Sequence, residues 1–215
     1  QYAFVWQNGT MLDLRGQLGA VDRSNWPRLF YAFDVNAAGQ IIGGGSVKIG
    51  KARYEQHGFL MTPAALQANT FGPGNDASSL SVAQVQRPLA EAVSRWQAAG
   101  VDESALAGID IRIADLPGAT LGLASGNTIW IDRNAAGWGW FVDRTPKNDS
   151  EFRRPGNQGE KRHMDLLTVL AHEIGHLLGF EHSEPGASAA GDVMADTLAT
   201  GVRRMPGSNT DWLAA

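Results

Sequence analysis

The chain has 215 residues, of which 43% are hydrophobic and 19% are charged, and its formal net charge at pH 7 is −4. This length and composition are typical of a globular protein with one large domain or two small ones, and they exclude a mainly disordered chain. The net charge offers no electrostatic basis for binding nucleic acid or an anionic membrane surface, so we expect neither partner. No apolar run approaches the length needed to cross a bilayer, and we expect no membrane span.

The chain contains no cysteine. Disulfides, thiolate zinc sites and cysteine nucleophiles are therefore excluded, and any metal site must use histidine and carboxylate ligands. The sequence begins at Gln1 without a basic-then-apolar signal segment, and we expect it to be a processed or excised piece of a longer protein.

Residues 1–62 are predicted to form a small all-β unit. An Asn-Gly turn at residues 8–9 separates two apolar runs, and residues 36–39 form a second predicted turn. Residues 63–79 are rich in Pro, Gly, Ser and Asn without periodicity, and they are predicted to be a linker. The remaining residues, 80–215, form the second predicted domain.

The elements predicted for this second domain alternate between helix and strand. Helical spacing of apolar residues over 80–99 predicts a helix that ends at Gly100, with a bend or a local loosening at Pro88. Three short strands are predicted at residues 109–116, 119–124 and 127–132, followed by an irregular loop over 133–160. A second helix is predicted from an N-cap at Asp165 to Gly179. The fold class is therefore α+β.

The second helix carries the segment "AHEIGHLLGFEHS", residues 171–183. His172 and His176 lie four residues apart, so a helix places both imidazoles on one face where they can bind one ion. Glu173 is placed to hydrogen-bond a water on that ion without ligating it. Gly179 permits a sharp turn that can return His182 as a third ligand. Three histidines and one water are the ligand set of a catalytic zinc site.

The alternative is an ordinary amphipathic helix that happens to carry histidines. A lone HExxH does not exclude it, but the extended pattern HExxHxxGxxH fixes five positions and rarely occurs by chance. An ordinary core helix would also carry apolar residues at 172 and 176, because buried titratable groups are costly without a partner. The metal-binding interpretation is favoured, with one catalytic Zn²⁺.

These motifs resemble the metzincin zinc peptidases, and within them the matrixin branch. "HEIGHLLGFEHS" carries the family pattern, including Ser183 after the third histidine, and "GDVMAD" places Met194 where the family has its Met-turn. The resemblance implies a twisted mixed sheet with an active-site helix and a Met-turn. It also implies a protein or peptide substrate lying antiparallel along an edge strand that contains Leu121, Gly122, Leu123 and Ala124. The substrate side chain after the scissile bond is then expected to enter a pocket near residues 192–200.

The sequence departs from the matrixin pattern at several positions. Leu123 and Trp130 stand where histidines usually hold a structural zinc, so a second zinc is not expected. Some metzincins have a tyrosine shortly after the Met-turn methionine. In this chain Ala195 and Asp196 follow Met194 instead. An acidic stretch is interpreted as solvated loop acids, with calcium binding as the alternative; its members are Asp132, Asp143, Asp149 and Glu151.

Residues 1–62 resemble the bacterial extracellular repeats of the HAF type, through "YAFVW" from Tyr2 and "VNAAGQIIG" from Val35. This resemblance implies a secreted or cell-surface bacterial protein. The combined prediction is a monomeric zinc endopeptidase in which Glu173 acts as general base. The alternative is a non-catalytic adhesin or binding module that retains a metzincin scaffold.

Overall fold

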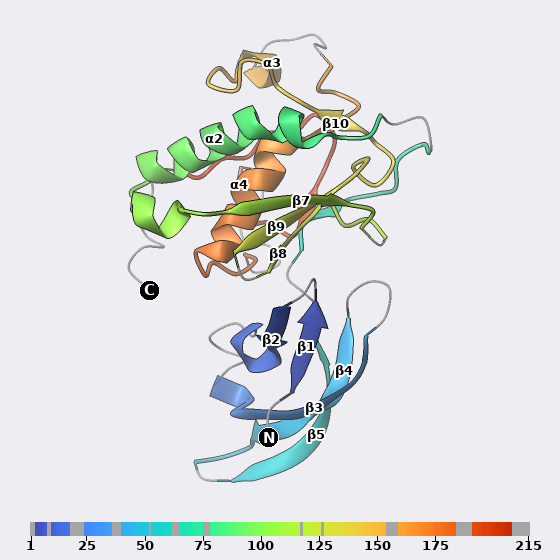
Figure 1. Cartoon of the computed structure of the whole chain (residues 1–215), viewed down its shortest axis with the longest axis vertical. Helices are drawn as coiled ribbons and strands as arrows, with labels where there is room; N and C mark the ends of the chain where they lie inside the picture. Colours follow the sequence, from blue (N-terminus) through green and yellow to red (C-terminus); the bar gives the residue numbers. More distant parts are fainter. Residues whose placement is uncertain are drawn as a thin grey trace. The chain divides into compact units, whose positions relative to one another are not determined.

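The structure is a computed structural model, and it describes residues 3–7, 10–17, 24–35, 40–51, 53–61, 65–74, 78–116, 118–125, 127–153, 159–183 and 191–207. The chain divides into two compact units, Gln1–Pro63 and Ala64–Ala215, drawn in Figure 1. The two predicted turns of the first unit, at residues 8–9 and 36–39, lie outside the described residues.

The first unit is built from antiparallel strands. Strands β1 (Phe4–Gln7) and β2 (Thr10–Asp13) form a hairpin that leads into the 3₁₀ helix η1 (Leu14–Gln17). A separate sheet has the order β3-β4-β5, with strands Arg28–Val35, Ile41–Lys48 and Tyr54–Met61. The small hydrophobic core of the first unit consists of Ala3, Leu14, Leu29 and Ile41. The described residues thus form strands, while their relation to HAF-type repeats stays a prediction.

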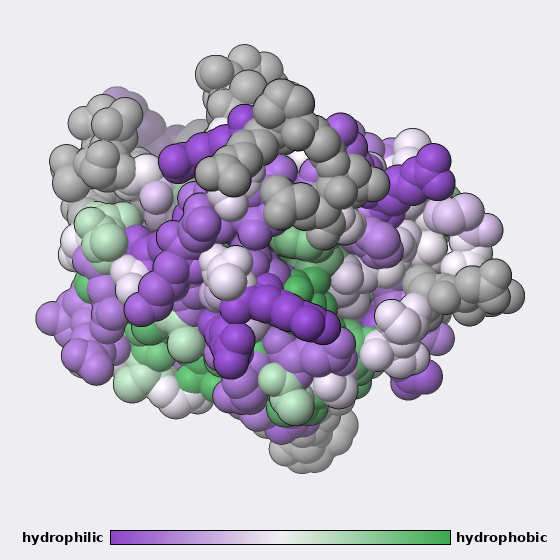
Figure 2. Space-filling view, turned by 90° about the horizontal axis from the view of Figure 1, so that it is seen from above, coloured by the Kyte–Doolittle hydropathy of each residue, from purple (hydrophilic) through white to green (hydrophobic). Residues whose placement is uncertain are grey.

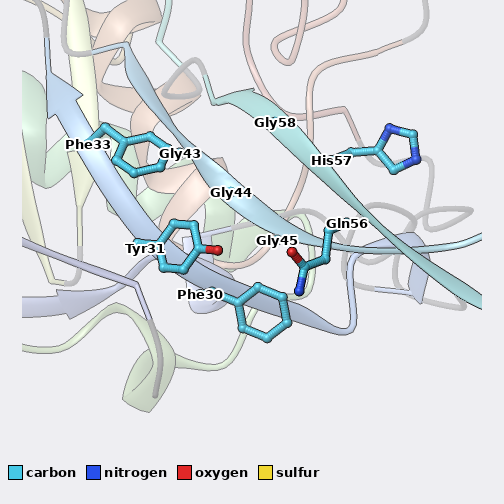
Figure 3. A pocket seen from close by; sticks show the side chains of 9 residues that line it. All are labelled: Phe30, Tyr31, Phe33, Gly43, Gly44, Gly45, Gln56, His57 and Gly58. Atoms are coloured by element: carbon cyan, nitrogen blue, oxygen red, sulfur yellow. The ribbon is translucent and has the colours of Figure 1, made fainter.

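Three consecutive glycines in β4 allow the strands to approach closely. A Cβ on Gly43 would lie 2.2 Å from the carbonyl oxygen of Tyr31, and one on Gly44 would lie 2.7 Å from the Tyr31 ring. Any larger residue would therefore push β3 away from β4. Beside these glycines is a hollow of 220 Å³. Figure 3 shows that the aromatic side chains at this hollow, Phe30, Tyr31 and Phe33, come from β3.

The first predicted helix is present in the second unit as α2 (Val82–Ala98). Ser81 is the N-cap of this helix, and it forms a capping box with Gln84, whose Oε1 accepts a hydrogen bond from the N–H of Ser81 at 2.9 Å. The helix continues through Pro88, and Gly100 follows its last turn with φ of 100°. Trp96 is fully buried, and its Nε1 donates to the carbonyl oxygen of Ala171 at 2.8 Å. This bond joins α2 to the helix that carries the histidines.

A mixed sheet of three strands lies under these helices (Figure 1). After the 3₁₀ helix η2 (Glu103–Leu106), β7 (Asp110–Ala114) runs parallel to β9 (Thr128–Asp132), and β8 (Gly122–Ser125) runs antiparallel to β9. The order β7-β9-β8 leaves β8 at one side of the sheet. The helix α4 (Leu166–Leu177) packs against β8 and β9, and α2 packs against α4. The three predicted strands and both predicted helices are present.

The stretch predicted as an irregular loop contains two short elements. Strand β10 (Trp140–Phe141) pairs in parallel with β11 (Met164–Asp165), and α3 (Ser150–Arg153) is a single turn. Trp140 is buried, and its Nε1 donates to the carbonyl oxygen of Asp132 at 2.8 Å. Pairing with β11 thus ties this stretch to the start of α4.

The segment predicted as a linker is partly built into the second unit. Strand β6 (Gln67–Ala68) pairs in parallel with β12 (Thr197–Leu198). Leu66 and Ala68 are 1% and 5% exposed and belong to the core of this unit, whereas Gln67 is exposed. The linker was predicted from amino-acid composition. An alternation of buried and exposed residues over so few positions is too short to give a periodic signal in the sequence.

No helix in the part of the chain that the structure describes is long and apolar enough to cross a membrane. Hydrophilic residues occupy most of the face shown in Figure 2, with hydrophobic residues visible in smaller areas between them.

Candidate metal centre

The helix α4 is positioned by its own cap and by burial on all sides. The Asp165 carboxylate accepts from the N–H of Thr168 at 3.1 Å, as expected for an N-cap. Every residue from Leu166 to Gly175 is buried. After the helix, Gly179 has φ of 90°, a conformation that favours glycine and turns the chain toward His182.

This turn brings three histidines together. The Nε2 atoms of His172 and His176 lie 2.9 Å apart, and each lies 3.2 Å from Nε2 of His182. Three nitrogens bound tetrahedrally to zinc at about 2.0–2.1 Å would be about 3.3 Å from one another. Among the described residues, this is the group of His, Asp or Glu side chains that meets the geometry of a metal site.

Two of the imidazoles are held by backbone carbonyls on their other nitrogen. Nδ1 of His172 lies 2.7 Å from the carbonyl oxygen of Val193, and Nδ1 of His176 lies 2.8 Å from that of Phe180. A carbonyl can only accept, so each Nδ1 carries the proton and each Nε2 presents a lone pair to the shared point. Lone pairs that converge in this way repel one another unless a cation lies between them, and the donor set therefore fits a zinc ion.

The surroundings of the three imidazoles favour their neutral form. Burial lowers the pKa of His176 to about 4, and burial together with the neighbouring His176 lowers the pKa of His172 well below its ordinary value. Burial likewise lowers the pKa of His182. Neutral imidazole is the form that ligates a metal, so little competition from protons is expected at neutral pH.

Met194 lies against the helix directly beside this group. A Cβ on Gly175 would come within 2.4 Å of the Met194 sulfur and 3.2 Å of the Trp96 ring. Only glycine can therefore occupy position 175 while Met194 stays in place. The segment is fixed further by Ser183, whose N–H donates to the carbonyl oxygen of Met194 at 3.1 Å and whose hydroxyl donates to the Asp192 carboxylate.

Glu173 points from α4 toward β8 and is fully buried. Its Oε1 accepts a hydrogen bond from the N–H of Leu66 at 3.3 Å, while Oε2 has no hydrogen-bond partner in the part of the chain that the structure describes. Burial raises the pKa of Glu173 to about 8, and the backbone N–H groups of Leu66 and Ala124 oppose this rise. A carboxyl group with a pKa in this range can take up and release a proton near neutral pH.

The four residues predicted to contact substrate have different surroundings. Leu121 is fully buried, and its N–H already donates to the carbonyl oxygen of Leu66 at 2.8 Å. A Cβ on Gly122 would lie 2.7 Å from the Glu173 Oε1, so this glycine makes room for the carboxylate. Leu123 and Ala124 are half-buried in β8. Their contact with a bound substrate stays a prediction.

The interpretation of the acidic stretch as solvated loop acids is wrong for two of its members. Asp132 is 2% exposed, and its carboxylate accepts from the N–H groups of Leu116, Asn134 and Ala136. Asp143 is 4% exposed and pairs with Arg203 at 2.8 Å. A buried charge is stable only with a partner, and the partners of these two carboxylates are backbone N–H groups of the loops and Arg203. Arg203 lies 60 positions after Asp143, so the sequence alone does not reveal this ion pair.

Arg203 is the centre of this charge cluster. Its side chain is 3% exposed and makes ion pairs with Asp143, Asp149 and Asp165 at 2.8, 3.1 and 2.8 Å. Asp149 also pairs with Arg95 of α2 at 2.7 Å. The cluster therefore connects α2, the loop before α4, the N-cap of α4 and the segment that follows β12.

We expect part of the stability of this unit to disappear in acid. Burial alone would raise the pKa of Asp149, but hydrogen bonds and charges from Arg95 and Arg203 outweigh it and lower the pKa. The stabilisation is therefore present above the unfolded-state pKa of about 3.9 and is lost as the pH falls through the lower folded-state value. Thermal melting should show a midpoint that falls steeply below pH about 4. The Asp149→Asn variant should melt lower at neutral pH and show a flatter decline in acid, and an equally steep decline would contradict this role.

The matrixin family model matches residues 118–211. Neither the curated proteins nor the solved structures yield a match to this chain. The matched range includes β8, β9, α4 and Met194, and it supports a metzincin-like peptidase domain and with it a metallopeptidase. Matrixins use zinc, in agreement with the three converging histidines.

Sequence reasoning singled out the three histidines and Glu173 but missed the residues that support them. Gly175 and Arg203 were not identified, and Gly122 was placed with the substrate rather than against Glu173. A glycine inside a helix is a recognisable signal of close approach, and Gly175 could have been found in this way. Nothing local to Arg203 indicates its three partners.

Proposed function

We propose that this chain is a zinc-dependent endopeptidase of the matrixin type that hydrolyses extracellular proteins. The single observation that carries the proposal is the convergence of three Nε2 atoms within 3.2 Å of one another, next to the buried carboxylate of Glu173. His172, His176 and His182 would hold a zinc ion, which would supply a Lewis acid and lower the pKa of a water molecule. The extracellular part of the proposal rests on the resemblance of residues 1–62 to HAF-type repeats.

The protein side chains supply the proton transfers. Glu173 takes a proton from the attacking water and later delivers it to the nitrogen of the leaving amine. Its Oε1 already lies 3.3 Å from a backbone nitrogen, that of Leu66, which supports the view that the carboxylate can reach a peptide nitrogen at this position. The carbonyls of Val193 and Phe180 keep two ligand imidazoles in the tautomer that leaves Nε2 free.

Removal of the metal tests this proposal. Purified chain should contain one zinc per molecule, and its cleavage of unfolded casein should be abolished by a chelator and restored by added zinc. The chelated protein should also melt at a lower temperature, because a ligand that binds the folded state stabilises it. A protein that binds zinc but leaves casein intact would favour the alternative, a binding module on a metzincin scaffold.

A further inference from the structure

The segment that precedes α2 lies along the edge of the sheet beside the metal centre. The N–H of Leu121 donates to the carbonyl oxygen of Leu66, and the N–H of Ala68 donates to that of Ala119, both at 2.8 Å. Gln67 and Thr120 form an antiparallel bridge between these two bonds. Residues 66–68 therefore extend the sheet next to β8 as an antiparallel strand.

The other side of the same segment contacts the chain after the Met-turn. The N–H of Gln67 donates to the carbonyl oxygen of Asp196, and the N–H of Asn69 donates to that of Leu198, both at 3.0 Å. This pairing with β12 is parallel. The segment is thus hydrogen-bonded on both edges, which is how an extended peptide is held in a groove between two strands.

The side chains of the segment are placed as those of a bound substrate would be. Leu66 is 1% exposed and belongs to the same buried cluster as Val193 and Leu198, which flank the Met-turn. This is where the side chain after the scissile bond is expected to lie. Gln67 is exposed and Ala68 is buried, as strand alternation requires.

The register of the segment selects one peptide bond. The nitrogen of Leu66 lies 3.3 Å from Oε1 of Glu173, whereas the next nitrogen, that of Gln67, faces Asp196. In peptide hydrolysis the general base finally protonates the nitrogen of the leaving amine. The bond whose nitrogen is in that position joins Ala65 to Leu66.

We propose that the chain is its own substrate and cleaves itself between Ala65 and Leu66, an inference that rests on the proposed peptidase function. The oxygen of water adds to the carbonyl carbon of Ala65, and the bond from that carbon to the nitrogen of Leu66 breaks. Glu173 accepts a proton from the water and passes it to the Leu66 nitrogen. The second proton of the water also passes to this nitrogen, so the products are a carboxylate at Ala65 and an ammonium group at Leu66, and the first unit separates from the second. Until it is cut, the segment excludes other substrates from the same edge.

Intact-mass measurement on the zinc-loaded full chain tests this inference. We expect two fragments, one that ends at Ala65 and one that begins at Leu66, which form at a rate that does not depend on protein concentration. Casein cleavage is measured in the same sample. Casein hydrolysis with an uncut Ala65–Leu66 bond, or with cuts elsewhere in the chain, overturns the inference and leaves the peptidase function standing. If neither casein nor the chain is cut, the proposed function itself fails. A rate proportional to concentration shows cleavage between molecules and also overturns the proposal.

A pair of variants tests the docking of the segment. Gln67→Pro removes the N–H that donates to Asp196 and should slow self-cleavage at least about tenfold. Gln67→Ala retains this N–H and changes only an exposed side chain, so the fragments should form as in the parent chain. Zinc content and melting temperature show whether each variant folds. Equal cleavage rates in the two variants would contradict the assigned docking.

Hydrogen exchange adds a readout that does not depend on catalysis. In the Glu173→Gln chain, which should stay uncut, the amides of residues 66–69 should exchange as slowly as those of β9. The Gln67→Pro substitution in that background should increase their exchange rate. Fast exchange in the unsubstituted segment would show that it is not paired with Ala119–Leu121 and Asp196–Leu198 in solution.

Discussion

Replacement of Glu173 by glutamine is expected to reduce peptide hydrolysis by about 10²–10⁴-fold while one zinc per chain is retained. Glutamine has nearly the same shape and still fits beside Gly122, but it cannot accept a proton from water. The three histidines that would hold the metal are unchanged. The measurement is the rate of casein hydrolysis together with the zinc content of the same preparation.

Glu103→Gln is the matched control for this prediction. Glu103 is an exposed residue of η2, so the same chemical change there should leave both hydrolysis and zinc content as in the parent chain. Full activity in the Glu173→Gln variant would remove this carboxylate from the mechanism. Loss of zinc from that variant would show that Glu173 supports the metal instead of the proton transfer.

Replacement of Arg203 by methionine is expected to destabilise the second unit by about 3–5 kcal/mol, since removal of one partner leaves buried charges unpaired. Three carboxylates lie within 3.1 Å of this guanidinium, which is also stacked 4.3 Å from the centre of the Phe152 ring. One of them, Asp165, also caps the helix that carries His172 and His176. The change in free energy of unfolding can be measured by urea denaturation, and zinc affinity should weaken with it.

The control for the arginine is an ion pair at the surface. Arg53 pairs with Glu55 at 2.9 Å, but their side chains are 75% and 45% exposed. Such pairs contribute about 0–1 kcal/mol, so Arg53→Met should hardly alter stability. A similarly small effect of Arg203→Met would show that the cluster is not needed for the fold.

The candidate site was largely predictable because helical geometry and one glycine turn fix where its histidines lie. His172 and His176 share a helix face, and Gly179 allows the return of His182, so local rules suffice. The predicted elements of the second unit followed from apolar periodicity in the same way.

Long-range partners were not predictable from these patterns. The pairing of residues 66–69 with both Ala119–Leu121 and Asp196–Leu198 depends on strands far away in the sequence. The segment itself is too short for a periodic signal, and its composition is that of a loop. Arg203 meets its carboxylates for the same reason, since tertiary packing alone brings them together. The assignment of Gly122 required knowledge of where the Glu173 side chain points.

The carbonyl anchors of His172 and His176 have a consequence for which ions the site would accept. Imidazole nitrogens held in fixed directions suit borderline transition metals, while hard ions such as Mg²⁺ and Ca²⁺ prefer oxygen donors. Affinity should rise from Mn²⁺ through Co²⁺ to Cu²⁺, with Zn²⁺ below copper. Co²⁺ should therefore bind at the same three histidines. Its visible absorption spectrum depends on coordination geometry, so the spectrum would report the coordination number of the bound ion.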